Sequence, residues 1–133
     1  MSFVHAKSTF ISLDGNNLSS STDSSELGRT ADSHDVTTYG KDSHVYQGGL
    51  LDGTAKMSGT YDNAVTGPGA VINPLVGQVV TLIRRKEGTG AGLPQESVDA
   101  LVKGYTETNP VADMVKWSCD LQLSDDIDFT PQA

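Results

Sequence analysis

Three histidines and their neighbouring aspartates are the side chains of this sequence that could hold a metal ion. They are His5, His34 and His44, with Asp32, Asp35 and Asp42 near the last two. A zinc site needs its nitrogen, sulfur or carboxylate ligands at a defined spacing, and structural sites usually include Cys. The spacing here matches no such pattern, and the single cysteine is distant in the sequence. We therefore expect exposed loop histidines and no metal centre.

Other segments fall short of the motifs that they suggest. The run from Gly88 to Gly92 is rich in glycine, but no Lys-Ser or Lys-Thr pair follows it, so it does not make a phosphate-binding loop. The acidic stretch 125–128 lacks the glycine and terminal glutamate of a calcium loop. Cys119 alternates with Trp117 and Leu121, which predicts a buried thiol rather than a nucleophile. The sequence therefore predicts no catalytic residue, no metal ligand and no cofactor, and we do not expect an enzyme.

The composition indicates one acidic domain with a lean core. The chain has 133 residues, a formal charge of −8 and 36% hydrophobic residues. A chain of this size can bury its own core, so we expect a single domain over 1–133 that ends in a loosely ordered acidic tail at 124–133. An acidic chain should not hold nucleic acid by its phosphates, which requires clustered Lys and Arg. With no apolar run of roughly 18 residues and no signal-peptide pattern, we expect an intracellular site of synthesis.

Alternation of polar and apolar side chains predicts a mainly β fold, a sandwich or barrel, with one short helix. The clearest strand is 114–123, where Val115, Trp117 and Leu121 share one face. Pro68 suits a first helical turn, and Pro74 would end that helix soon after. We expect strands at 8–13, 25–31, 36–39, 54–61, 78–84, 96–106 and 114–123, turns at 14–17 and 32–34, and one or two helical turns within 68–76. The side chains expected to point inward are Met57, Val80, Leu82, Val115, Trp117 and Leu121.

A long polar segment, residues 41–53, joins two of these expected strands. A two-residue turn would be enough to reverse the chain between strands 36–39 and 54–61. Ordered loops that exceed this need are usually functional. We therefore expect 41–53 to be a functional loop.

Two rows of polar side chains face away from the expected core. They are Lys56, Ser58 and Thr60 in one strand, and Lys116, Ser118, Asp120 and Gln122 in another. Successive side chains of a strand point to opposite faces, so each row lies opposite the apolar residues of its own strand. Taken alone, each row is an ordinary solvent-exposed face.

Several short segments follow one another in an order that is similar to a known family. They are 13–15, 29–40, 45–50, 52–62 and 110–115, which span most of the chain. In this order they resemble the major tail tube proteins of long-tailed, siphovirus-type bacteriophages. The resemblance implies a β-sandwich or barrel subunit with one short helix. It also implies that six copies form a ring and that stacked rings form a tube, whose inner sheets join into a β-barrel around a lumen.

The resemblance assigns roles to the residues singled out above. The long loop would contact the adjacent ring through Lys41, Asp42, Ser43, His44, Val45, Tyr46, Gln47, Gly48 and Gly49. One or both polar rows would line the lumen, with candidates Lys56, Ser58, Thr60, Lys116, Ser118, Asp120 and Gln122. The implied partners are copies of the same chain, a tape measure protein, tail-end proteins, and double-stranded DNA in transit without specific binding, with no membrane. The implied location is the virion tail, assembled in the host cytoplasm.

Two alternatives stay open at this point. One is the related tube protein of a contractile injection apparatus, which a sheath-binding outer surface would distinguish. The other is a monomeric β-sandwich that binds a carbohydrate or a protein. Such a domain would expose aromatic side chains on a platform, whereas Trp117 lies in an alternation that predicts burial.

Overall fold

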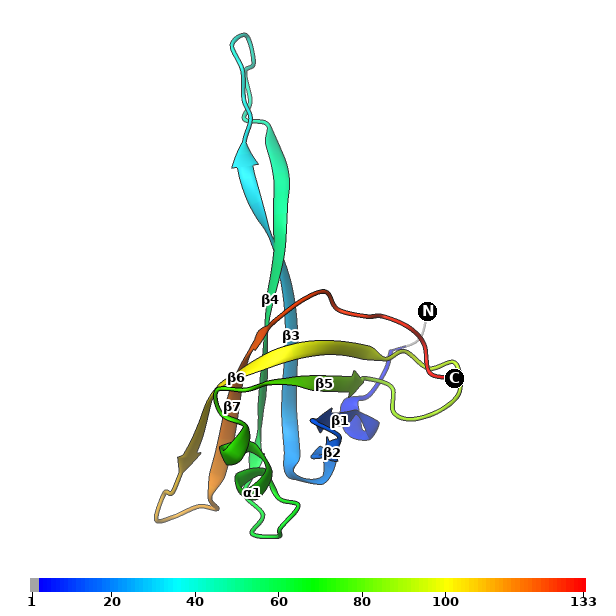
Figure 1. Ribbon diagram of the computed structural model, residues 1–133, viewed down its shortest axis with the longest axis vertical. Helices are drawn as coiled ribbons and strands as arrows, with labels where there is room; N and C mark the ends of the chain where they lie inside the picture. Colours follow the sequence, from blue (N-terminus) through cyan, green and yellow to red (C-terminus); the bar gives the residue numbers. More distant parts are fainter. Residues whose placement is uncertain (1–2) are drawn as a thin grey trace.

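Seven strands form one antiparallel sheet in the computed structural model, which describes residues 3–133. Their order across the sheet is β2-β1-β5-β6-β7-β4-β3 (Figure 1). The strands are β1 Phe10–Leu13, β2 Asn16–Asn17, β3 Thr22–Asp35, β4 Tyr46–Thr60, β5 Val79–Arg85, β6 Glu96–Thr108 and β7 Lys116–Leu123. The prediction of a mainly β fold with one short helix is confirmed. The first two residues of the expected domain lie outside the described part.

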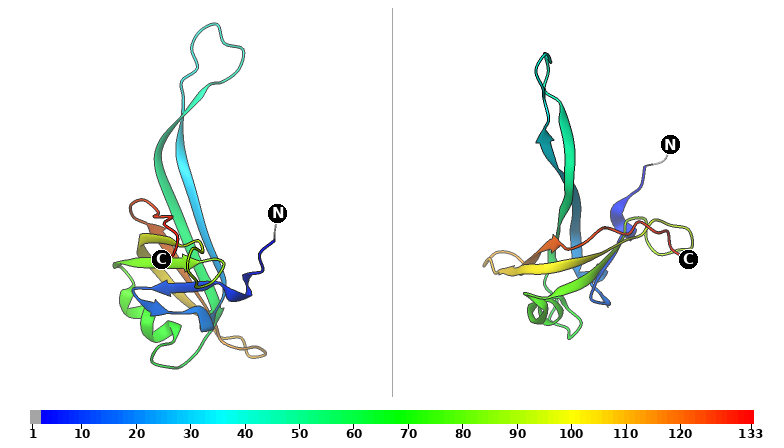
Figure 2. Two further views of the ribbon diagram at one scale, coloured as in Figure 1. Left: turned by 90° about the vertical axis from the view of Figure 1, so that its right-hand side faces the viewer. Right: turned by 45° about the horizontal axis from the view of Figure 1, so that its top comes forward.

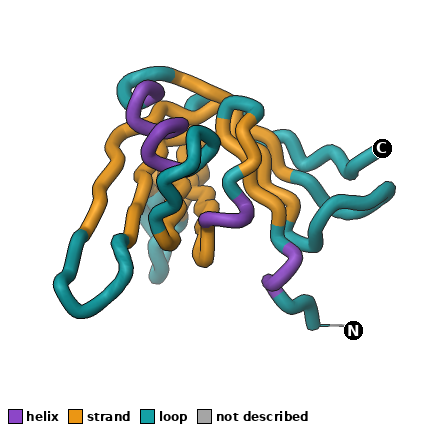
Figure 3. Tube along the Cα trace, turned by 90° about the horizontal axis from the view of Figure 1, so that it is seen from below, coloured by secondary structure: helices purple, strands orange, loops and turns teal. Residues whose placement is uncertain are grey.

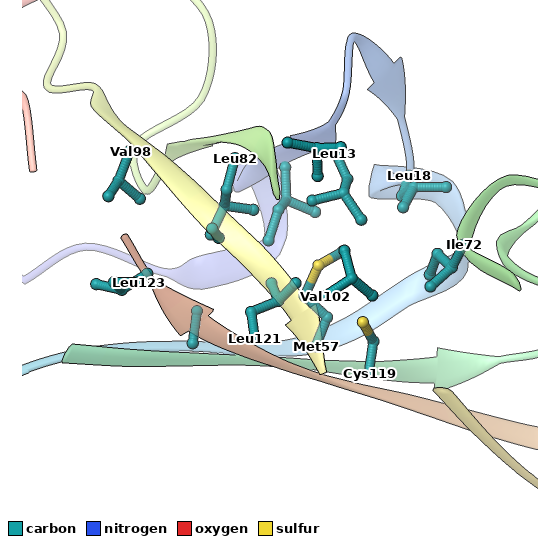
Figure 4. Packing of buried hydrophobic residues seen from close by; sticks show 14 of the residues in the cluster. Leu13, Leu18, Met57, Ile72, Leu82, Val98, Val102, Cys119, Leu121 and Leu123 are labelled. Atoms are coloured by element: carbon teal, nitrogen blue, oxygen red, sulfur yellow. The ribbon is translucent and has the colours of Figure 1, made fainter. Parts of the chain in front are cut away.

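The sheet curls until its two ends face each other across the hydrophobic core (Figures 1 and 2). Met57 of β4 and Leu121 of β7 face Leu13 of β1 and Leu18 across this core (Figure 4). The buried hydrophobic residues are Ile11, Leu13, Leu18, Ala55, Met57, Ile72, Val80, Leu82, Val98, Ala100, Val102, Trp117, Cys119, Leu121 and Leu123. Five of the six side chains expected inward are thus buried, and Val115 is half-buried.

A bulge in β6 allows the sheet to turn. The pairing of β6 with β7 shifts register between Val102 and Gly104. Bulges bend a strand and increase its local twist. The first half of β6 pairs with β5 as far as Leu101, and Val102 exchanges backbone hydrogen bonds with Gly77 and Gln78 just before β5. The second half of β6 continues past the start of β5 (Figure 1).

A tight hairpin starts the sheet. Asp14 and Gly15 both have positive φ, 52° and 78°, as both central residues of a type I′ turn require. Asn16 and Asn17, which we expected within the turn, instead pair with Leu13 and Ser12 as the short strand β2. The expected turn is therefore two residues long instead of four.

The helix α1, Pro68–Ile72, continues into a 3₁₀ turn, Asn73–Leu75, and lies over one end of the core (Figures 1 and 3). Pro68 stands in the first turn, where its missing N–H costs nothing. Ile72 is the fully buried anchor of the helix. The prediction of one short helix within 68–76 is confirmed. Two further 3₁₀ turns lie at Ala6–Ser8 and Ser19–Ser21.

The region expected to hold two strands and a long loop is one continuous hairpin. β3 runs unbroken to Asp35, so the predicted turn at 32–34 and the predicted strand 36–39 are both wrong. Most of 41–53 is the first half of β4, and the loop itself spans only 36–45. We call residues 28–52 the arm and residues 36–45 its tip. Apart from half-buried Thr37, the arm is exposed on both faces, so no alternation marked its strands.

Residues 124–133 are bonded to the sheet, so the expectation of a loosely ordered tail is wrong. Asp128 exchanges backbone hydrogen bonds of 2.7 and 2.9 Å with Ser97 at the start of β6. Ile127 packs against the core. Gln132 bonds through its backbone and its side-chain amide to Gly88, Gly90, Gly92 and Leu93. These bonds are made by backbone groups and one amide, which an acidic composition does not reveal.

Trp117 should be the most costly side chain to truncate. It is 2% exposed, and its indole N–H donates to the Ser21 carbonyl at 3.1 Å. We expect Trp117→Ala to lower the free energy of unfolding by about 3–5 kcal/mol, measured by denaturant titration. Val111→Ala, at a fully exposed position, should change it by less than about 0.5 kcal/mol. A Trp117→Ala variant as stable as this control would contradict the core described here.

Candidate functional site

The two predicted polar rows lie side by side on one face of the sheet. The opposed pairs of β4 and β7 are Thr54 with Gln122, Lys56 with Asp120, Ser58 with Ser118, and Thr60 with Lys116. Residues directly opposite each other on antiparallel strands point to the same face. The alternate residues of both strands, such as Met57 and Cys119, point into the core. The seven residues predicted from alternation therefore form one continuous surface.

Residues of β3 and β6 extend this surface on both sides. On β3, Glu26 is opposite Lys56 and Ser24 is opposite Ser58. On β6, the positions opposite Asp120, Ser118 and Lys116 are Gly104, Thr106 and Thr108. We call these residues of β3, β4, β7 and β6 the polar face. It is four strands wide and lies on the opposite side of the sheet from the core.

Charges on the polar face alternate in sign across the strands. Lys56 stands between Glu26 on one side and Asp120 on the other. Lys116 donates to the Thr60 hydroxyl at 3.1 Å. Two lysines thus stand with two carboxylates, while the whole chain carries −8. The polar face is balanced in charge rather than acidic.

Two strand edges beside the polar face have no partner within the described residues. β3 is the last strand of the sheet, so one side of its backbone is free over its whole length. The second half of β6 extends past β5, which pairs no further than Leu101. An unpaired edge is a template for pairing with another chain. The four strands of the polar face therefore end in a free edge on each side.

The arm projects from the sheet as a two-stranded ribbon (Figures 1 and 2). It exposes more apolar surface than a solvated hairpin needs. The large hydrophobic residues exposed on it are Val36, Tyr39, Val45, Tyr46, Leu50 and Leu51. Exposed apolar residues gathered on one element mark an interaction site.

The tip is closed by a small network around Asp35. The carboxylate of Asp35 accepts the backbone N–H of Thr37 at 2.9 Å and also its hydroxyl. The Thr37 hydroxyl accepts the N–H of Val45 at 2.8 Å. His44 Nδ1 lies 3.2 Å from the other carboxylate oxygen of Asp35. The bonds from Thr37, first from its hydroxyl, hold the pKa of Asp35 below its usual value.

Candidate chemistry outside these surfaces is sparse. The described residues hold no group of three or more His, Cys, Asp or Glu side chains that could bind a metal ion. Burial raises the pKa of the Cys119 thiol to about 12, so this buried thiol stays protonated. No helix among residues 3–133 is long and apolar enough to span a membrane.

The structure brings some predicted residues together and separates others. The lumen candidates share the polar face. Lys41, Asp42, Ser43, His44 and Val45 lie in the tip, whereas Tyr46, Gln47, Gly48 and Gly49 begin β4. Sequence reasoning did not assign Glu26, Thr106 and Thr108 to the polar face. Glu26 and Thr106 lie within the expected strands 25–31 and 96–106, whose pairing with the polar rows was not predicted, and Thr108 lies beyond the expected strand end at 106. The signal available in the sequence was the spacing of Thr106 and Thr108, which are two residues apart and therefore lie on the same face of a strand.

Comparisons with known proteins give structural matches without sequence matches. No protein-family model and no curated protein matches the sequence. A chain of the virion of a native gene transfer agent particle matches with a TM-score of 0.80 and 13% identity, over 96% of this chain and 99% of that chain. A chain of the tail of an empty gene transfer agent particle, refined with C6 symmetry, gives 0.79 and 14%, with the same coverage. The SPP1 tail tube gives 0.76 and 9%, over 98% of this chain and 81% of that chain.

The chain has the tail-tube fold. At 9–14% identity, few side chains are shared with the matching structures. A tail-tube fold can persist at such identity because cores tolerate many simultaneous apolar substitutions when volume and pattern are kept. Here that pattern is the core-facing alternation of β4, β6 and β7.

The pKa of Asp35 gives a pH prediction for the tip. Because the carboxylate is stabilised in the folded state, its bonds keep the tip closed above 3.8, the ordinary value, and are lost as the pH falls below it. The Val45 amide should therefore exchange slowly, relative to its intrinsic rate, from neutral pH down to that value, and faster below it. Asp35→Asn should remove this pH dependence. Protection of the Val45 amide that stays the same in Asp35→Asn at every pH would contradict the role of this carboxylate in closing the tip.

Proposed function

We propose that this chain is the structural subunit of a virion tail tube, through which DNA passes into a host. The observation that carries the proposal is the polar face, a four-stranded surface with a free strand edge on each side, on a subunit with the tail-tube fold. A monomeric domain usually covers or shortens such edges. Here both edges can be used when neighbouring copies pair.

Pairing of unlike edges gives the ring. The free edge of β3 differs from the free half of β6, so their pairing is head-to-tail and generates a closed ring when the rotation closes. The gene transfer agent tail was refined with sixfold symmetry, which supports six copies per ring for this chain. The four strands of each copy would then form one continuous barrel wall, with the polar face toward the lumen.

The arm would carry the contact between stacked rings. Its strands rise beyond the rest of the sheet and expose apolar side chains that the subunit itself does not cover. The residues proposed for this contact are Lys41, Asp42, Ser43, His44, Val45, Tyr46, Gln47, Gly48 and Gly49. Leu50 and Leu51 of the arm belong with them, since both are exposed.

The lumen would let DNA pass without holding it. The proposed lining is Lys56, Ser58, Thr60, Lys116, Ser118, Asp120 and Gln122. Lys56 stands opposite the carboxylates Glu26 and Asp120, and Lys116 stands opposite the hydroxyl of Thr60. Such a surface offers phosphates no cluster of cations. A tape measure protein would occupy the tube before the DNA, and tail-end proteins would close it. The chain would act in the virion tail, without enzymatic activity or a cofactor.

The tip should be dispensable for folding and necessary for stacking. Val36 and Val45 already pair across the hairpin, so residues 37–44 can be replaced by Asn-Gly, which closes a two-residue turn. We expect the shortened protein to melt as the parent does, and to form rings but no long tubes by electron microscopy. A conservative substitution of Ser43 alone leaves the tip in place and serves as the control, so this variant should form long tubes. Long tubes from the shortened protein would contradict the role of the arm.

New cations on the polar face should slow the passage of DNA. Virions carrying Ser118→Lys and Asp120→Lys should have intact tubes but eject DNA more slowly, because added lysines attract the phosphate backbone. A matched control places the same change of charge in the loop after β5, as Thr89→Lys with Glu87→Lys. If both variants eject DNA at the parental rate, the polar face does not line the lumen.

A further inference from the structure

The arm and a shallow groove lie at opposite ends of the same strand. β4 begins in the arm at Tyr46 and ends at Thr60, where the groove begins. Fifteen residues of strand span roughly 50 Å at about 3.4 Å per residue. The loops that border the groove, 61–67 and 109–115, lie at the pole opposite the tip (Figure 1).

The groove at this pole holds about 490 Å³ and is walled by Ser21, Thr60, Tyr61, Met114 and Val115. The backbone N–H of Tyr61 donates to the Val115 carbonyl at 2.8 Å, which fixes the two loops side by side. Met114 is 64% exposed, and the neighbouring Val111 is fully exposed. This pole therefore exposes large apolar side chains, as the tip does, beside polar lining residues such as Asp62 and Asn63.

We propose that the groove receives the tip of the arm from a second copy of this chain. This rests on the proposed function, and it specifies which surface of the next ring the arm binds. Subunits stacked in one direction bring the tip of one copy to the opposite pole of the next. Because tip and groove differ, the contact is head-to-tail and does not close, so it extends into a filament.

The chemistry of the two partners agrees. Tyr39 at the tip is fully exposed and offers a large apolar ring with a polar end, the kind of residue that anchors interfaces. Lys41 of the tip carries a positive charge and Asp62 carries a negative one. Asp62 is the charged side chain among the described residues that line the groove, so the two can form an ion pair across the contact. The exposed Met114 is a flexible side chain that adapts to a ring packed against it.

A second cleft fits the tip less well. It holds about 600 Å³ between the N-terminal segment, the end of β5 and the start of β3. Its wall includes Lys7, Arg84, Lys86, Asp23 and Glu87. Arg84 is already bonded to buried Glu96 at 2.8 Å. In this cleft the exposed apolar side chains of the tip, such as Tyr39, would displace water from five charged side chains. Among the residues that line the groove at the pole, Asp62 is the charged one, so less desolvation is required there.

Disulfide trapping tests the contact, because Cys119 is the one cysteine of the sequence and is buried. Tyr39→Cys and Met114→Cys are made as separate proteins, mixed, assembled and oxidised mildly. A disulfide needs Cα atoms within about 7 Å. We expect a shift from the 14.0 kDa monomer band to a covalent dimer in the mixture, and no dimer from either variant alone. Val111→Cys in place of Met114→Cys allows for a small offset along the groove.

Tyr39→Cys mixed with Lys86→Cys is the matched control for the second cleft. A dimer from this pair, with none from the pole variants, would overturn the proposal in favour of the cleft. Tubes that form without a dimer in any mixture would overturn it while leaving the tail-tube function in place. If the parent protein forms neither rings nor tubes, the proposed function fails, and the docking of the arm fails with it.

Discussion

Closure of the curled sheet depends on one close approach between Trp117, Ser21 and Gly59. The indole N–H of Trp117 donates to the Ser21 carbonyl, and Gly59 stands opposite Trp117 in the sheet. A Cβ at position 59 would overlap that same carbonyl oxygen, so only glycine fits. Tyr105 stacks on Trp117 with ring centroids 6.2 Å apart. This single junction brings β4, β6, β7 and the segment before β3 together at one end of the core.

The closure determines what is left for assembly. Because the sheet buries one face around its own core, the opposite face of β3, β4, β7 and β6 remains wet. The bulge after Val102 carries the second half of β6 away from β5, which leaves its backbone edge open. The arm lies outside the curl and has no core to pack on. The core therefore stabilises the subunit, whereas the arm and the free strand edges are available for association. Substitutions on the arm should for this reason not disturb the fold.

Strands with one buried and one exposed face could be predicted from the sequence, whereas strands exposed on both faces could not. Trp117, Cys119 and Leu121 alternate strictly because one face of β7 is buried and the other is wet, and the polar rows follow from the same rule. The arm strands were misread because both of their faces are exposed, so the pairing of residues such as Thr30 with Asp52 leaves no pattern. The alignment of Lys56 with Asp120 could not be predicted either, since register between strands distant in sequence depends on the turns and bulges of the whole sheet.

The arrangement of charge on the polar face has a consequence for the proposed tube. Lys56 would repeat in every subunit, and a closed ring of lysines alone would attract the phosphate backbone of passing DNA. Glu26 and Asp120 stand directly opposite it on the neighbouring strands, so every copy of Lys56 is flanked by a carboxylate on each side. At distances greater than roughly a Debye length of 8–10 Å, these opposite charges largely cancel. The wall would then neither attract nor strongly repel DNA, and the acidic surplus of the chain would not be needed to keep the channel open.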